Sequence, residues 1–251
     1  MKKLNIFLTV IIALFLNSCS DILDVRDTSV ISPEIWDSEA SASLFINTLY
    51  AQMPTSQIIS SSTSPFGNHA SWSDETLGSN KFVNGEFTYS DIAVFNDSYY
   101  TKIRNINIAL NEMKTSAMDR DAYKRIVGQA YFLRAWAYWN LVVVYGGVPY
   151  ITEPVNPFVD DSVKLDPPRN KTTECIQYIC QDLDSAVANL PASALSYLKG
   201  NTEYARVTRS AAAALKGRVL LYFASPQFNP TNIVSRWEDA YQANKAALTL
   251  A

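Results

Sequence analysis

A polar and irregular stretch, residues 54–92, carries the side chains best suited to bind a ligand. The candidates are Asn68, His69, Trp72, Asp74 and Glu75. An indole ring packs against the apolar C–H face of a sugar, while amide and carboxylate groups hydrogen-bond its hydroxyls. Trp72 could equally anchor the loop on neighbouring helices, and the sequence favours neither role. Loops longer than about 15 residues are uncommon in compact domains and are often functional, so this stretch is the candidate binding site.

The same residues do not form a catalytic or metal-binding set. His69 is the only histidine, and a zinc site needs three or four ligands. Asp74 and Glu75 are adjacent, so in an extended segment they point apart, whereas a glycosidase needs its carboxyls on opposite sides of the scissile bond. No G-x-S-x-G motif is present. Asp160 and Asp161 lack calcium-ligand spacing and are read as part of a solvated connector. We therefore expect no enzyme activity, no cofactor and no bound metal.

The composition is that of a globular protein. The chain has 251 residues, of which 48% are hydrophobic and 18% are charged, and its net charge is −3. Nucleic-acid binding is not expected, because it requires a basic face. The chain holds only 8 glycines, so a glycine-rich phosphate-binding loop is not expected either.

The N-terminus has the pattern of an export signal. Residues 1–18 combine a basic start, an apolar run too short to span a bilayer and a small residue before Cys19. A cysteine at this place resembles a bacterial lipobox, so we expect cleavage before Cys19 and its acylation. Lipid chains would then hold the mature chain on a membrane through a tether at residues 19–31. Asp21 and Asp24 resemble the surface-export signals of Bacteroidetes-type lipoproteins.

Hydrophobic periodicity predicts an all-α fold. Helices are expected over residues 32–53, 95–116, 119–145, 172–190 and 207–224, and from residue 236 onward. Small residues at helical spacing resemble tetratricopeptide repeats, which bury their faces only by stacking. The apolar pattern of the last helix reaches residue 251, so we expect a domain over 32–251 that is truncated at its C-terminus, has an exposed apolar face and is poorly soluble alone.

Four side chains within the helices carry specific expectations. Arg134 lies in a nearly all-apolar helix, so a structural ion pair is expected far more than a ligand contact. Cys175 and Cys180 are five residues apart on one helix, where they point about 140° apart and cannot form a disulfide. Trp237 is expected in the core.

The central helix and the turn after it carry a resemblance to a known family. Residues 128–142 (GQAYFLRAWAYWNLV) and 145–151 (YGGVPYI) resemble the signature of SusD/RagB proteins. Other blocks that resemble the family, in the same order, are YxxIxxIN at 100–107, PR at 168–169, IxxDLDxA at 179–186, and RVTR at 206–209.

The resemblance implies a function as well as a fold. SusD/RagB proteins are surface lipoproteins that bind nutrients, usually glycans and sometimes peptides, on tetratricopeptide-like helix pairs. Each partners a SusC-type TonB-dependent barrel in the outer membrane, to which it delivers its ligand. The resemblance therefore implies a glycan-binding lipoprotein facing the cell exterior. The alternatives are a peptide or another nutrient as the ligand, or a helical scaffold for protein partners.

Overall fold

The computed structural model describes residues 33–52, 84–86, 99–156, 160–192 and 206–250. Cys19, the tether and the five candidate residues between Asn68 and Glu75 lie outside these ranges. The chain divides into two units, Met1–Ile35 and Trp36–Ala251. Of the first unit only Pro33–Ile35 are described, and they begin a short 3-10 helix.

Every regular element within the described ranges is helical, as the sequence predicts. The elements are η1 (Pro33–Asp37), α2 (Glu39–Gln52), α3 (Tyr99–Glu112), η4 (Met113–Thr115), α4 (Arg120–Tyr145), α5 (Ser162–Leu165), α6 (Thr172–Asn189), α7 (Arg209–Ala224) and α8 (Val234–Thr249).

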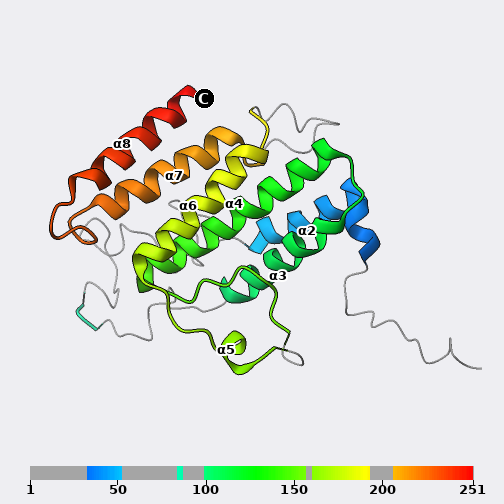
Figure 1. The fold of residues 1–251 in the computed structure, drawn as a ribbon, viewed down its shortest axis with the longest axis horizontal. Coiled ribbons are helices and arrows are strands. Elements are labelled where there is room, and N and C mark those ends of the chain that lie inside the picture. The colour runs from blue at the N-terminus through cyan, green and yellow to red at the C-terminus, as the bar shows by residue number, and fades with distance from the viewer. Residues whose placement is uncertain (1–32, 53–83, 87–98, 157–159, 193–205, 251) are drawn as a thin grey trace, which may run out of the picture. The chain divides into compact units, whose positions relative to one another are not determined.

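The long helices of the second unit form an antiparallel array. α8 packs on α7, α7 on α6, and α6 on α4, while α2 and α3 both contact α4 (Figure 1). Each helix from α3 onward, apart from the single turn of α5, runs opposite to the long helix before it in the chain (Figure 1). This arrangement confirms the tetratricopeptide-like prediction, because each layer buries one face of its neighbour.

Helix α4 is the central element, as its all-round apolar pattern predicts. It begins after Asp119, whose carboxylate accepts hydrogen bonds from the backbone amides of Asp121 and Ala122. It ends at Gly146, which has a φ of +72° that glycine adopts without steric cost. Ala135, Ala137 and Tyr138 are completely buried. The helix therefore fixes the positions of α2, α3 and α6 around it.

The predicted helix over 32–53 is wrong in one detail, because it is broken at Ser38. A turn of 3-10 helix precedes the break, and α2 starts after it. The Ser38 carbonyl accepts from the Ala42 amide at 2.9 Å, and its hydroxyl accepts from the Ser41 amide at 3.4 Å. Ser38 therefore provides a new start, and the turn before it buries Trp36 against Phe45.

The position of Trp237 on α8 differs from the prediction. Trp237 was expected in the core, but 38% of its surface is exposed, and its indole N–H donates to Asn232 Oδ1 at 3.0 Å. The buried side of α8 is carried instead by Ala240, which packs toward α7. On α6, Cys175 is buried and Cys180 is partly buried, and both are free, as their spacing predicts.

Candidate functional site

The candidate residues at 68–75 lie outside the described ranges, so their grouping stays a prediction. The structure does place the segment that follows α4, residues 146–156 and 160–167, which we call the connector. The connector runs along α3, α4 and α6 and carries the short helix α5 (Figure 1). Its first residues belong to the YGGVPYI block of the sequence signature.

A buried ion pair stands beneath the connector. Arg134 on α4 donates from Nε to Asp182 Oδ2 at 2.8 Å and from Nη2 to Asp182 Oδ1 at 2.6 Å. The two side chains are only 8% and 7% exposed. Burial alone would lower the pKa of Arg134, but the hydrogen bonds and charge of Asp182 outweigh burial and raise it. The expected structural pair is therefore confirmed, and Asp182 on α6 is the partner.

The same network holds the connector backbone in place. Arg134 also donates to the Thr152 carbonyl at 3.2 Å and to Asn107 Oδ1 at 3.0 Å. Asn107 in turn donates to the Ile151 carbonyl at 2.8 Å, which also accepts from the Tyr138 hydroxyl at 2.9 Å. Two helices, α3 and α4, thus satisfy two successive carbonyls of the connector, which leaves this stretch little freedom to move.

Tyr150 links the connector to α6. Its hydroxyl donates to Asp182 Oδ2 at 2.9 Å, and its ring stacks on Tyr138 with centroids 3.7 Å apart. Burial, together with the charge of Asp182, raises the pKa of Tyr150 well above its ordinary value. Burial likewise raises the pKa of Tyr138. Both phenols are therefore neutral hydrogen-bond donors at physiological pH.

The sequence blocks that carried the resemblance meet in this network. Asn107 comes from the YxxIxxIN block, Arg134 and Tyr138 from the signature helix, and Asp182 from the IxxDLDxA block. These residues bind each other and the backbone, so their role is structural. A signal for Asp182 was present in the sequence: it lies on the apolar face of its helix, three residues after Ile179, where a carboxylate needs a partner.

Two small cavities adjoin the connector. One has a volume of about 200 Å³ and the other about 220 Å³, and both are lined by Ile151, Glu153, Val155 and Lys164. We call the pair the connector cleft. The first cavity is completed by Tyr100, Ile103, Arg104 and Asn107 of α3 with Leu165 of α5. The second is completed by Tyr150, Thr152, Pro154, Asp160 and Pro167. Sequence analysis missed this cleft, because its walls come from segments about 50 residues apart.

The charges around the cleft are mixed. Lys164 pairs with Asp160 at 3.2 Å, and the hydrogen bond and charge of Asp160 raise the pKa of Lys164. Asp160 also accepts from the Asn156 amide, and Asp161 accepts from the Lys164 amide as the cap of α5. Within the described residues, neither Arg104 nor Glu153 forms a hydrogen bond or ion pair. The charge of Glu153 also raises the pKa of Lys164, so the two groups lie close together. The cleft therefore presents the guanidinium of Arg104 and the carboxylate of Glu153, neither of which has a hydrogen-bond partner among the described residues.

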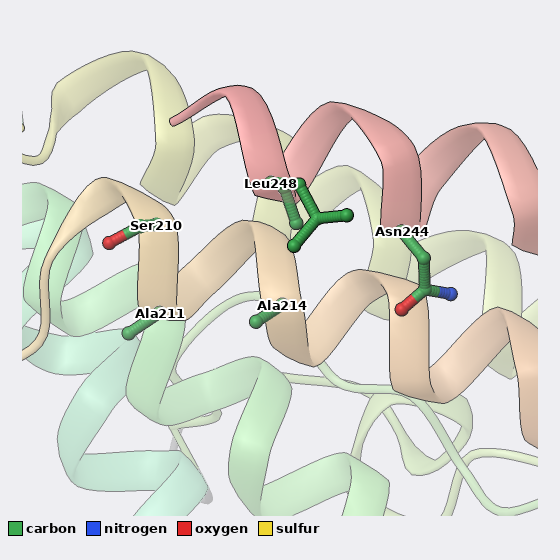
Figure 2. A pocket seen from close by; sticks show the side chains of 6 residues that line it. Ser210, Ala211, Ala214, Asn244 and Leu248 are labelled. Atoms are coloured by element: carbon green, nitrogen blue, oxygen red, sulfur yellow. The ribbon is translucent and has the colours of Figure 1, made fainter. Parts of the chain in front are cut away.

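A larger cavity lies on the other side of the array, between the start of α7 and the end of α8. Its volume is about 470 Å³, and Figure 2 shows Asn244 and Leu248 extending from α8 above the small side chains of α7. The lining residues are Ser210, Ala211, Ala214, Asn244, Ala247 and Leu248. The Asn244 amide is already occupied, since it donates to the Gly217 and Ala240 carbonyls. Leu248 is 80% exposed, so this cavity adjoins an apolar side chain that the described residues leave exposed.

Two other features are absent from the described residues. These residues contain no group of three or more histidine, cysteine, aspartate or glutamate side chains placed to hold a metal ion. Nor does any helix among them combine the length and apolarity that crossing a bilayer requires.

The chain is similar to a family of known proteins along most of its length. A SusD-like family model, described as "Starch-binding associating with outer membrane", matches residues 21–221. The SusD-like protein P38 of Formosa agariphila is 27% identical over 265 residues, which cover 96% of this chain and 49% of that protein. The SusD-like protein P2 of the same organism is 28% identical and is covered over 44% of its length. This chain thus spans about half the length of these curated relatives.

Solved structures agree with the sequence relatives. A SusD-like protein from Bacteroides fragilis superimposes with a TM-score of 0.64 at 26% identity, over 89% of this chain and 40% of that one. A laminarin-binding SusD-like protein superimposes with a TM-score of 0.53 at 25% identity, over 76% of this chain and 42% of that one. The helical array described above is therefore shared with these proteins.

Proposed function

We propose that this chain, which belongs to the SusD-like family, is part of a surface lipoprotein that binds a nutrient glycan and passes it to an outer-membrane barrel. The observation that carries the proposal is the family match over residues 21–221, in a family described as starch-binding and associated with the outer membrane. The name of one solved relative, a laminarin-binding SusD-like protein, supports a glycan as the ligand class.

The proposed capture site is the 54–92 loop. Trp72 would stack on the face of a sugar ring, and Asn68, Asp74 or Glu75 would hydrogen-bond its hydroxyls, with His69 beside them. Capture requires no bond to be broken, and the loop carries no paired acid and base, so we propose a binding protein and not an enzyme. The helical array would serve as the rigid support on which the loop is mounted.

The proposed location follows from the N-terminus. Acylation of Cys19 would anchor the mature chain, and a tether over residues 19–31 would separate the helical unit from the membrane surface. A SusC-type TonB-dependent barrel is the proposed partner that receives the glycan. Replacing Cys19 with alanine should release the protein from the membrane fraction, and protease treatment of intact cells should degrade the wild type if it faces outward. A protein that stays membrane-bound without Cys19 would contradict the anchor.

A glycan array tests the ligand class. The mature full-length protein should bind a defined set of glycans, and Trp72→Ala should abolish that binding. Trp237→Ala is the matched control, because Trp237 is an exposed tryptophan on α8 and is not part of the proposed loop. Binding that survives Trp72→Ala would move the site away from the 54–92 loop. If the folded wild type binds no glycan, a peptide ligand or a scaffold for protein partners becomes the better reading.

A further inference from the structure

The connector cleft combines a rigid floor with unpaired polar groups. Its floor is rigid because the carbonyls of Pro149, Ile151 and Thr152 accept hydrogen bonds from Tyr100, Asn107, Tyr138 and Arg134. A site built on backbone that is held in this way loses little conformational entropy when a ligand binds. The cleft therefore has the preorganisation that weak, polar ligands need.

The size of the cleft limits the ligand. Each cavity has a volume of about 200 Å³, below the roughly 300–1,000 Å³ that pockets for drug-sized molecules occupy. The two cavities share four lining residues, so they adjoin. A ligand made of small units joined in series would fit, for example one or two neighbouring sugar rings of an oligosaccharide. One large aromatic ring system would not fit.

The charge pattern selects a neutral ligand rich in hydroxyls. Lys164 forms an ion pair with Asp160, and the charge of Glu153 acts on it as well. The guanidinium of Arg104 and the carboxylate of Glu153 keep their hydrogen-bonding capacity, since neither has a hydrogen-bond partner among the described residues. An anion attracted by Arg104 would be repelled by Glu153, and a cation attracted by Glu153 would be repelled by Arg104, so neither ion gains much from the pair. A hydroxyl group satisfies both, since it accepts from the guanidinium and donates to the carboxylate. Ile103, Ile151 and Val155 supply apolar surface for the C–H groups of a sugar ring.

From these observations we propose that the connector cleft is a second glycan subsite, which binds one or two neutral sugar rings between Arg104 and Glu153. This inference rests on the proposed glycan function and adds a place of contact separate in sequence from the 54–92 loop. Two contact points on one chain of sugars would raise the affinity for longer oligosaccharides over short ones, because the second contact becomes intramolecular.

Methyl NMR of the mature full-length protein tests the subsite directly. Isoleucine methyl groups are labelled, and maltoheptaose, laminarihexaose and each glycan found on the array are added in turn. The signals of Ile103 and Ile151, which line the cleft, should shift with a glycan that binds. The signals of Ile46 and Ile179, which are fully buried elsewhere, should stay in place and serve as the check on folding.

Variants separate this subsite from the loop. In the double variant Arg104→Ala/Glu153→Ala, the Ile103 and Ile151 shifts should vanish and glycan affinity should fall roughly tenfold or more, because two charge-assisted hydrogen-bonding groups are lost. The matched control is Arg120→Ala/Glu238→Ala, which removes the same residue types from exposed positions outside the cleft. The control should keep both the shifts and the affinity.

Each of the other possible outcomes would contradict a specific part of the proposal. If glycans bind on the array but Ile103 and Ile151 do not shift, or shift equally in the cleft variant, the subsite is wrong and the proposed function stands. If the dipeptide Ala-Ala shifts these signals and no glycan does, the ligand class of the cleft is wrong, because a zwitterion then pairs with Arg104 and Glu153. If no glycan binds the folded protein anywhere, the proposed function and the subsite fail together.

Discussion

Arg134 and Asp182 are 48 residues apart in the chain, yet their side chains form two parallel hydrogen bonds of 2.6 and 2.8 Å in the interior. The pair joins α4 to α6, and through Asn107, Tyr150 and the Thr152 carbonyl it also fastens α3 and the connector. One buried ion pair thus sets the relative positions of three helices and of the segment that lines the cleft.

Removing one partner of this pair should be costly. In Asp182→Ala the guanidinium of Arg134 stays buried without its carboxylate, so we expect the free energy of unfolding to fall by about 3–5 kcal/mol. Chemical denaturation of the mature protein measures this. The matched control is Asp184→Ala, which breaks the more exposed pair with Lys216 and should cost about 1 kcal/mol or less. Equal losses in the two variants would show that burial does not govern the Arg134 pair.

The close approach of Gly147 to the backbone before α6 gives a second prediction. A Cβ at this position would lie 2.1 Å from the Asn170 carbonyl oxygen and 3.0 Å from the Thr172 amide nitrogen. Gly147→Ala should therefore shift the backbone and destabilise the protein by about 1–3 kcal/mol, measured as a lower denaturation midpoint. In Gly217→Ala the Cβ would meet the Asn244 side chain, which can rotate away, so the loss should be smaller. A larger loss at Gly217 would contradict this ranking.

The buried tyrosines predict sensitivity to alkali. Burial raises the pKa of Tyr100 from 10.0 to about 12. A phenol whose pKa is raised on folding stabilises the fold fully below its unfolded pKa, and this contribution is lost as the pH rises through the folded pKa. Stability should therefore decline between pH 10 and 12, together with tyrosine ionisation followed by ultraviolet absorbance.

Variants assign part of this decline to Tyr100. In Tyr100→Phe the loss of stability between pH 10 and 12 should be less steep than in the wild type, although the hydrogen bond to the Pro149 carbonyl is also removed. The control is Leu248→Ala, which changes an exposed apolar side chain on α8 and should keep the alkaline decline of the wild type. An identical decline in Tyr100→Phe would rule out Tyr100 as a contributor.

The two sides of α8 should respond oppositely to changes in size. Ala240 is 1% exposed against α7, so Ala240→Leu should overpack the interface and cost about 1–3 kcal/mol. Leu248 is 80% exposed, so Leu248→Ala should change stability by only about 0.5 kcal/mol. Thermal unfolding of both variants measures the contrast. A large loss in Leu248→Ala would mean that this side chain is covered in the protein as tested.

Most of the fold could be predicted from local sequence. The helix limits follow from the 3.6-residue apolar period and from capping residues: Asp119 starts α4, Gly146 ends it, and Thr208 starts α7. The break at Ser38 was missed, because the apolar period continues across it and only the hydroxyl cap and the burial of Trp36 reveal a new start. Local patterns therefore predict helices well and short interruptions poorly.

The candidate site was less predictable. The 54–92 loop residues stay a prediction, while the connector cleft was not anticipated at all. Arg104 and Glu153 are charged residues of an ordinary kind, and both are exposed in the structure. Nothing in their spacing along the chain indicates that they line the same cavity. They line one cavity only because the Arg134–Asp182 network lays the connector along α3.

The sequence by itself determined the all-α class, the order of the helices and the need for a buried partner for Arg134, because periodicity, caps and the cost of an unpaired buried charge are local properties. Tertiary structure alone decided that Asp182 is that partner and that Trp237 faces outward. Helical spacing states which residues share a face, but whether anything covers that face depends on chain segments distant in the sequence.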